Sequence, residues 1–363
     1  MKYADIEGLG KKDAFKQGIV GLVKTTAKNI LSQRIRIVPE SLGEPAALLD
    51  FVDEDFYLAF KTDGVGTKSL IAEKMAVLAR RKKWPKKRII NLYAGLGIDL
   101  IASNVNDLVC LGAAPIALAD EIAAGSFGKF LDQDFIKGLL SGLKKGCQEA
   151  GITIPCGESP TLTDVIKAGV CSITGSSIGI IRPKQQAVFG QKLQAGDIIY
   201  GLTADGIHTN GLSLARKIAG KLPQGYFTAF GKKTVGEELL RPTRIYSQII
   251  LEMIKDLEIH YLSHISGSAF RKISRAKKPF TYAISNLPRP PKILTALQKW
   301  GRLSNAEAYE TWNMGLGMAI FAPAGQEKKM LTICRKYKVG FIKLGRVESG
   351  PKRVIIKGGL WQY

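Results

Sequence analysis

The sequence contains few cysteines and histidines and no long apolar run. Five cysteines and three histidines occur among 363 residues, and no two cysteines have CxxC spacing. This scatter excludes a disulfide framework and a zinc motif, so we expect reduced, mostly buried thiols in a cytoplasmic protein. No apolar run reaches the roughly 18 residues of a membrane span. The opening MKYADIEGLGKKDAF lacks an apolar signal core, so no export is expected.

Acidic residues are scarce relative to basic ones. The chain has 31 Asp and Glu against 53 Lys and Arg, which gives a formal net charge of +22. Seven basic residues fall within the nine of Arg80–Arg88 (RRKKWPKKR). Such a run is more often a solvated loop than a binding patch, although a positive field also suits nucleic acid or steers small anions into a cleft. Charge alone does not choose among these functions.

The length and the apolar fraction of 45% suit two domains, each with a core of its own. Strand-like and helix-like segments alternate in both halves, which predicts α/β or α+β domains. The polar, proline-containing segment Ile181–Gln186 is the best candidate for the junction. We therefore expect domains at residues 1–183 and 184–363.

Hydrophobic periodicity predicts the individual elements. The clearest helix is Phe135–Ala150, whose apolar residues recur every three or four positions and which Gly151 can cap. A second long helix is expected at Leu240–Leu257, with Pro242 in its first turn. Shorter helices are expected at Ile71–Arg80 and Gly211–Ile218. The expected strands are Phe56–Phe60, Ile116–Ala123, Ile152–Pro155, Val170–Ile181, Ile198–Leu202, Met318–Ala322 and Arg353–Ile356.

A glycine-punctuated polar segment, Lys61–Leu70 (KTDGVGTKSL), follows the first of these strands. It is not a P-loop, because Gly66 is followed by Thr67 where that motif has lysine. Its glycines still allow the backbone to approach a bulky anion. Asp63 suits Mg²⁺ and Lys68 suits a phosphate, although the same residues also suit a plain turn.

A second polar group lies on a predicted helix within Gly97–Pro115. At about 100° per residue, its apolar residues share one face, while Asp99 and Asn106 share another and Asp107 lies about 80° from that pair. A solvated helix face is one interpretation. The side chains are all short Asp, Asn and Ser, however, and short oxygen donors are what Mg²⁺ requires.

Further candidates lie in glycine-containing segments elsewhere. Glu158 follows Gly157 at the end of a strand-like run, where a carboxylate either points into a site or caps a turn. His208 and His264 lie in the polar loops ADGIHTNGLSL and SHISGSAF, and a third such loop reads WNMGLGM. Structural and functional roles for these two histidines are equally consistent with the pattern.

In this order, the motifs resemble those of the phosphoribosylformylglycinamidine cyclo-ligases, the aminoimidazole ribonucleotide synthetases, and most closely their archaeal branch. The matching segments are TDGVGTK (Thr62–Lys68), GIDLIASNVNDLVCLGAAPIAL (Gly97–Leu118), GLKKGCQEAGI (Gly142–Ile152), GESPTLTDVI (Gly157–Ile166), GLTADGIHTNGLSLARK (Gly201–Lys217), LLRPTRIY (Leu239–Tyr246), SHISGSAF (Ser263–Phe270) and NMGLGM (Asn313–Met318). Any one of these is weak evidence, but their shared order over most of the chain is strong.

The resemblance implies a fold and an activity. It implies an N-terminal α/β domain whose sheet closes a barrel with that of a second subunit in a homodimer, followed by a C-terminal α+β domain. It also implies ATP-dependent cyclisation of formylglycinamidine ribonucleotide to 5-aminoimidazole ribonucleotide in purine biosynthesis. In that reaction the formamide oxygen is phosphorylated so that it can leave. ATP and Mg²⁺ are the implied cofactors.

The resemblance also assigns roles to residues. For nucleotide binding it implies Thr62, Asp63, Gly64, Gly66, Thr67, Lys68, Asp99, Asn106 and Asp107. For the metal it implies Asp63, Asp99, Asp107 and Glu158. For the substrate it implies His208, Thr209, Asn210, Ser266 and Asn313. The catalytic candidates are His264, His208 and Asp63, with His264 slightly favoured as the residue that moves the amidine proton.

Several positions depart from the family pattern. Cys156, Ser268, Ala269 and Ala47 replace family glycines, and Arg80–Tyr93 resembles an insertion. These changes affect the expected substrate more than the expected ATP and Mg²⁺. The alternatives are a kinase or ligase of the same superfamily, such as a thiamine-monophosphate kinase, and a basic nucleic-acid-binding relative. A selenophosphate synthase is disfavoured because the N-terminal region has no reactive cysteine loop.

Overall fold

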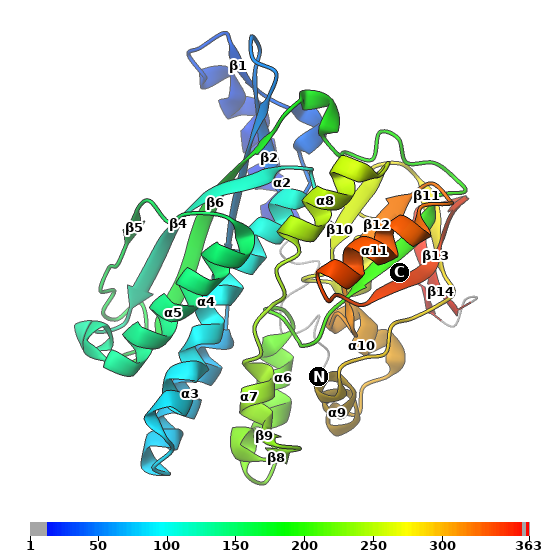
Figure 1. Ribbon diagram of the computed structural model, residues 1–363. Helices are drawn as coiled ribbons and strands as arrows, with labels where there is room; N and C mark the ends of the chain where they lie inside the picture. Colours follow the sequence, from blue (N-terminus) through cyan, green and yellow to red (C-terminus); the bar gives the residue numbers. More distant parts are fainter. Residues whose placement is uncertain (1–12, 358–360, 363) are drawn as a thin grey trace.

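Two mixed sheets form the framework of the protein (Figure 1). The computed structural model describes residues 13–357 and 361–362. The N-terminal sheet has the strand order β1-β2-β3-β6-β4-β5, and the C-terminal sheet has the order β10-β12-β7-β13-β11-β14-β15. The expected two-domain α/β and α+β class is therefore confirmed, while the division at residue 183 stays a prediction.

The strands of the N-terminal half are β1 (Ile35–Ile37), β2 (Ala47–Phe51), β3 (Tyr57–Gly64), β4 (Ala114–Ala124), β5 (Gly157–Glu158) and β6 (Cys171–Ile181). Those of the C-terminal half are β7 (Ile198–Thr203), β8 (Ala229–Phe230), β9 (Lys233–Thr234), β10 (Tyr261–His264), β11 (Phe280–Ile284), β12 (Leu316–Ala322), β13 (Phe341–Ser349), β14 (Arg353–Ile356) and β15 (Trp361–Gln362). The helices are α2 (Asp13–Thr26), α3 (Lys68–Arg81), α4 (Lys86–Val109), α5 (Gln133–Ala150), α6 (Leu212–Ala219), α7 (Val235–Leu239), α8 (Ser247–Asp256), α9 (Lys292–Gly301), α10 (Asn305–Thr311) and α11 (Glu327–Lys336).

Most expected elements are present within a few residues of their expected bounds. Helix α5 shows the reason most clearly. Its N-cap Asp132 accepts hydrogen bonds from the first-turn amides, and Gly151 ends the helix with the left-handed φ of 74° that glycine adopts without strain.

Two expected elements are wrong. Ile152–Pro155 forms only an isolated bridge at Thr153, and the strand follows later, at β5. The helix expected at Leu240–Leu257 begins only at Ser247. Before it, the amides of Thr243 and Tyr246 donate to side chains of α4 instead of to helical carbonyls, so this segment stays irregular.

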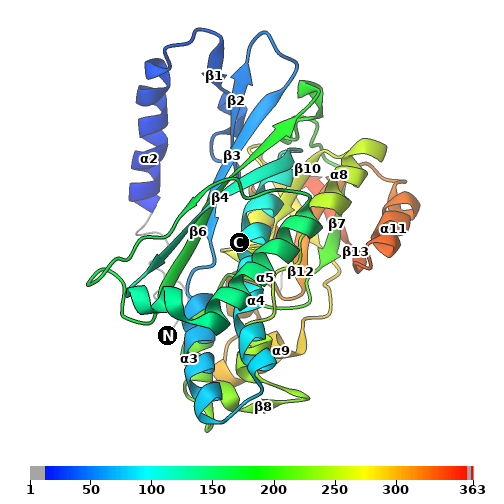
Figure 2. The same ribbon diagram turned by 60° about the vertical axis from the view of Figure 1, so that its left-hand side comes forward.

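Helices α4 and α5 lie against one face of the N-terminal sheet and pack closely on each other (Figure 2). Glycines allow this approach. A Cβ at Gly142 would lie 1.9 Å from the Ala94 carbonyl oxygen, and one at Gly97 would lie 2.4 Å from the Leu143 amide nitrogen. Helix α4, which carries the predicted polar group, is thus held between α5 and the N-terminal sheet.

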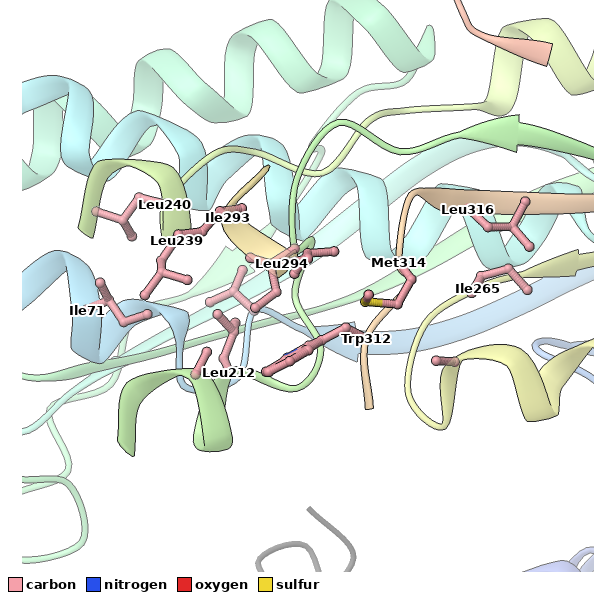
Figure 3. Packing of buried hydrophobic residues seen from close by; sticks show 14 of the residues in the cluster. Ile71, Leu212, Leu239, Leu240, Ile265, Ile293, Leu294, Trp312, Met314 and Leu316 are labelled. Atoms are coloured by element: carbon pink, nitrogen blue, oxygen red, sulfur yellow. The ribbon is translucent and has the colours of Figure 1, made fainter. Parts of the chain in front are cut away.

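The hydrophobic core continues from one domain into the other (Figure 3). Ile71 of α3 shares a buried cluster with Leu212 of α6, Leu239 of α7, Leu294 of α9 and Trp312. Burying each large side chain contributes about 1.5–3 kcal/mol. This shared core holds the loops of the C-terminal domain at a fixed place relative to α3 and α4.

Two arginines of the basic run are built into the fold. Arg80 pairs with Asp132 and Asp134, and Arg88 pairs with Glu237 while its guanidinium lies 3.6 Å from the Trp84 ring centroid. These contacts hold the connection between α3 and α4, so part of the run has a structural role.

The cysteines follow the expectation from their spacing. All five are free thiols, and Cys110, Cys171 and Cys334 are buried. Within residues 13–357 and 361–362, no helix has the length and apolarity needed to cross a membrane. The expectation of no signal core concerns the first fifteen residues, of which 1–12 lie outside the described residues.

Candidate functional site

The predicted residues of the two domains meet at an ion-paired chain of four side chains. The Asp107 Oδ1 atom of α4 lies 2.8 Å from Nδ1 of His264, at the end of β10. Its Oδ2 atom lies 2.8 Å from the Lys61 ammonium of β3, which also lies 3.2 Å from Asp63 Oδ2. The order His264–Asp107–Lys61–Asp63 therefore bridges the two domains.

The charges in this chain stabilise one another. Burial disfavours the ionised carboxylate of Asp107, but the hydrogen bond from His264 and the charge of Lys61 outweigh it and hold the pKa of Asp107 far below its usual range. Burial likewise disfavours the Lys61 ammonium, yet Asp107 and Asp63 raise its pKa above the ordinary value. Both groups are thus charged at neutral pH.

The two candidate histidines lie side by side and have different surroundings. Their ring centroids are 6.5 Å apart, and both side chains are buried. Asp107 orients His264 through Nδ1, and the Nε2 atom of His264 has no hydrogen-bond partner among the described residues. Within the same part of the chain, neither ring nitrogen of His208 has a partner. Burial, followed by nearby positive charge, holds the pKa of His208 well below its usual value. His208 is therefore neutral, while the catalytic role expected for His264 stays a prediction.

Lys68 and Asp99 form a buried latch between the domains. Neither side chain has exposed area, and Lys68 Nζ lies 2.7 Å from Asp99 Oδ2 and donates to the Arg241 carbonyl at 2.6 Å. Asp99 Oδ1 accepts from both the amide and the hydroxyl of Thr243. Both Asp99 oxygens and the Lys68 ammonium thus have partners inside the protein. To bind a metal ion or a phosphate as expected, either residue would have to share or give up one of these contacts.

Asn106 forms a second latch about two turns after Asp99 and directly before Asp107. Its amide group donates to the Arg244 carbonyl at 2.9 Å, and its Oδ1 accepts from the Tyr246 amide at 2.8 Å. The polar face of α4 is thus buried against residues 241–246 and does not face solvent. Its short side chains fit the backbone of the other domain, which is the physical reason that long, flexible residues are absent from it.

The remaining residues of the nucleotide motif lie around the end of β3. Asp63 Oδ1 accepts from the Gly64 amide at 2.8 Å. Gly66 has a φ of +55° and open space where a Cβ would stand, and Thr67 directly precedes the 14-residue helix α3. Amides at such a helix start suit a phosphate. The Thr62 hydroxyl lies 2.8 Å from that of Ser176 on an exposed part of the sheet.

The substrate candidates of the C-terminal domain are partly engaged in shaping loops. Asn313 donates to the Gly206 carbonyl at 2.9 Å and accepts from the Gly315 amide, so it ties two loops together. Asn210 donates to the Thr209 hydroxyl at 3.3 Å, and a Cβ at Gly267 would lie 3.1 Å from Asn210 Oδ1. The HTNG and SHISG motifs are therefore neighbours.

Glu158 does not join the other carboxylates. Strand register pairs Asp63 with Gly175 and Gly175 with Asp120, so these residues share one face of the sheet. Glu158 pairs with Glu121, the neighbour of Asp120, and so belongs to the opposite face. Among the described residues, no group of three or more His, Cys, Asp or Glu side chains is close enough to hold a metal ion.

Sequence reasoning missed three charged residues near the site. Lys61 lies two positions before Asp63 on β3, so strand alternation places both on one face and offered a signal. Asp120 needed the strand register. Lys272, which follows the SHISG loop, donates to the Ser266 hydroxyl. No local pattern in the sequence marked Lys272.

Two of the positions that lack the family glycine keep a backbone that favours glycine. Ser268 has a φ of 64° and Ala269 a φ of 40°. Ala47, in contrast, is an exposed residue at the start of β2, paired with Phe60, and Cys156 is exposed. Of the four positions that lack the family glycine, only Ser268 and Ala269, in the SHISG loop, adjoin the candidate site.

This fold and site define the class of AIR synthase related proteins. The N-terminal domain of that family matches residues 43–181, and its C-terminal domain matches residues 194–357. Within the class, the chain belongs to the phosphoribosylformylglycinamidine cyclo-ligase family. It is 39% identical to the Methanocaldococcus jannaschii cyclo-ligase over 90% of this chain and 88% of that protein. The Pyrococcus horikoshii cyclo-ligase is 37% identical, over 88% and 87%.

Solved structures show the same fold at lower identity. A thiamine-monophosphate kinase from Stenotrophomonas maltophilia K279a superposes with a TM-score of 0.59 at 18% identity, covering 93% of this chain and 96% of that one. The structure of AaThiL complexed with AMPPCP and TMP superposes with a TM-score of 0.58 at 16% identity, covering 93% of each chain. The resemblance to the archaeal cyclo-ligases is thus confirmed by sequence, and the superfamily fold by structure.

Proposed function

We propose that this protein is a phosphoribosylformylglycinamidine cyclo-ligase that uses ATP to convert formylglycinamidine ribonucleotide to 5-aminoimidazole ribonucleotide. The observation that carries the proposal is the Asp107–His264 contact, which joins the nucleotide motif of one domain to a proton-transfer group of the other. Identities of 34–39% to named cyclo-ligases support it.

The chemistry needs activation of a poor leaving group. The γ-phosphorus of ATP forms a bond to the formamide oxygen as its bond to the β–γ bridging oxygen breaks, and that electron pair leaves with ADP. The amidine nitrogen then attacks the formamide carbon. The carbon–oxygen bond breaks, phosphate departs with its electron pair, and a base removes the proton from the nitrogen. The base assigned here is His264, through Nε2, with Asp107 holding its ring in place.

ATP is the proposed phosphoryl donor. The structural relatives include AaThiL complexed with AMPPCP and TMP, and the T. maritima PurL complexed with ATP. In this chain the loop between β3 and α3 offers backbone amides and an open glycine to such a triphosphate. His208, buried and neutral, serves as a hydrogen-bonding group for the substrate.

Mg²⁺ is the proposed cofactor, and it would neutralise the phosphate oxygens when bound. Asp63 and Asp107 fit it best, because their oxygens converge on the single ammonium of Lys61 from two elements. Asp99 fits less well, because its side chain has no exposed area and is paired with Lys68, whereas 43% of the Asp63 side chain is exposed. Glu158 belongs to the other face of the sheet and does not share this site within one chain.

A homodimer in the cytoplasm completes the proposal. The N-terminal sheet exposes Phe60 and Ile116, and α2 exposes Phe15, Ile19 and Leu22. Exposed apolar groups of this size suit a partner surface, and a second copy that closes a barrel is the occupant that the family resemblance implies. Free thiols suit a reducing cytoplasm.

A turnover assay tests the function. Purified protein, ATP and Mg²⁺ are mixed with formylglycinamidine ribonucleotide or, in a parallel reaction, with thiamine monophosphate. We expect phosphate release and aminoimidazole ribonucleotide with the first substrate only. ADP formation that requires thiamine monophosphate, or no product from a folded protein that binds ATP, would reject the cyclo-ligase.

A further inference from the structure

Lys272 is a cation at the site to which the mechanism above gives no role. It lies in the short helix Ala269–Ser274 that follows the SHISG loop, and its side chain is half-buried. Its ammonium donates to the Ser266 hydroxyl, while its carbonyl accepts from the Ser263 hydroxyl at 2.7 Å. Both the side-chain ammonium and the backbone carbonyl of Lys272 therefore contact the SHISG loop.

The ammonium of Lys272 lacks a carboxylate partner among the described residues. Asp107 attracts it, but His264 contacts one oxygen of Asp107 and Lys61 contacts the other. Asp63 is paired in turn with Lys61. A half-buried cation without a carboxylate partner is well placed to bind an anionic ligand.

The charged neighbours come from every side of Lys272. Asp107 on α4 and Asp63 on β3 attract its ammonium, whereas Lys61 on β3 and Arg275 just after the short helix repel it. Burial, the largest influence, lowers the pKa of Lys272 to about 8. Lys272 is thus mostly protonated at neutral pH and can bind an anion.

We propose that Lys272 and Ser266 bind the phosphoryl group beside the SHISG loop, both on the formamide oxygen and as the phosphate that leaves. This inference rests on the proposed function and adds a residue to it. Lys272 belongs to the same loop as His264, the proposed base, and not to the nucleotide loop. When the carbon–oxygen bond breaks and its electron pair leaves with phosphate, the ammonium neutralises the added charge.

Lys278 provides a matched control in the same segment. Its ammonium donates to the carbonyls of Gln191 and Leu193, neither of which belongs to the site. K272M removes the charge at nearly constant length, K272R retains the charge, and S266A removes the hydroxyl partner. K278M removes a charge that supports the fold only.

The first measurement is binding of inorganic phosphate to the full chain in the presence of ADP and Mg²⁺, by calorimetry. We expect K272M to weaken phosphate binding at least roughly tenfold and S266A to weaken it less, because a charge-assisted hydrogen bond is the stronger of the two. K278M should bind as wild type does, and K272R should bind within about threefold of wild type because it keeps the charge. Wild-type phosphate affinity in K272M overturns the proposal, as does a wild-type chain that does not bind phosphate.

The second measurement is turnover. K272M should lower kcat on the order of 100-fold, with KM for ATP nearly unchanged and partial recovery in K272R. If K272M loses turnover but binds phosphate with wild-type affinity, Lys272 has a structural role only, and the proposal is overturned. The binding measurement needs no turnover. A wild-type chain that binds phosphate through Lys272 but does not cyclise formylglycinamidine ribonucleotide contradicts the proposed function alone.

Discussion

At the scale of single residues, the structure separates two histidines between which the residue pattern did not choose and the family resemblance chose only slightly, in favour of His264. Both lie in glycine-containing loops, and nothing in their flanking residues distinguishes them. The difference comes from α4, more than a hundred residues earlier in the chain, whose Asp107 reaches His264 and not His208. Only three-dimensional contact shows that one ring is held by a carboxylate and the other is not.

The first prediction concerns these two rings. H264Q should lower kcat by about 10²–10⁴-fold, because glutamine cannot accept the amidine proton. H208Q should lose much less, since a neutral amide also donates and accepts hydrogen bonds. Steady-state kinetics on variants with wild-type circular dichroism provide the test. Equal losses in the two variants would contradict the assignment.

The second prediction concerns the buried latch. D99A leaves the Lys68 ammonium buried without its partner, and such a change costs about 3–5 kcal/mol of unfolding free energy. Urea denaturation measures it. E149A, which removes an exposed partner of Lys145, is the control and should change stability by at most about 0.5 kcal/mol. A D99A variant as stable as wild type would show that the latch does not hold the domains.

At the scale of elements, the sequence pattern predicted those helices and strands whose bounds depend on neighbouring residues in the chain. The period of α5 and its Gly151 cap were sufficient to find that helix. The segment before α8 has a helical pattern, but side chains of α4 take its amides, and no local signal shows this. The same limit explains the site: spacing predicted that Asp99 and Asn106 share a face, while their role as interdomain latches depends on what packs there.

The third prediction tests the strained start of the short helix Ala269–Ser274. Holding a non-glycine residue at a left-handed φ costs about 1–2 kcal/mol, and a glycine at the same position avoids this cost. The greater conformational freedom of glycine in the unfolded chain offsets part of the stability gained. S268G should therefore raise the unfolding free energy by up to about 1 kcal/mol. S172G, on a regular strand, should lower it. Thermal and urea unfolding give both values, and a destabilised S268G would argue against strain at this position.

At the scale of the whole molecule, a shared core and two latches join the domains. The family, the fold class and the order of the motifs could be predicted from the sequence, because they depend on many residues at once. The metal set could not, because it depends on which carboxylates stay accessible after folding. The Asp63 side chain is 43% exposed, that of Asp107 5% and that of Asp99 not at all.

The fourth prediction addresses assembly. Phe60 lies on the outer face of the N-terminal sheet with 42% of its area exposed. F60E would place an unpaired charge in the proposed dimer interface and should shift the protein toward monomer, since burying such a charge costs several kcal/mol. Light scattering should give twice the chain mass of 39.5 kDa for wild type and a lower mass for F60E. A wild-type monomer would contradict the dimer.

The most direct test of the central claim follows the formamide oxygen. Formylglycinamidine ribonucleotide labelled with ¹⁸O in its formyl group is turned over with unlabelled ATP, and the released phosphate is analysed by mass spectrometry. Phosphorylation of that oxygen predicts one ¹⁸O atom in each phosphate formed with aminoimidazole ribonucleotide. Unlabelled phosphate, with the isotope in water, would contradict the account.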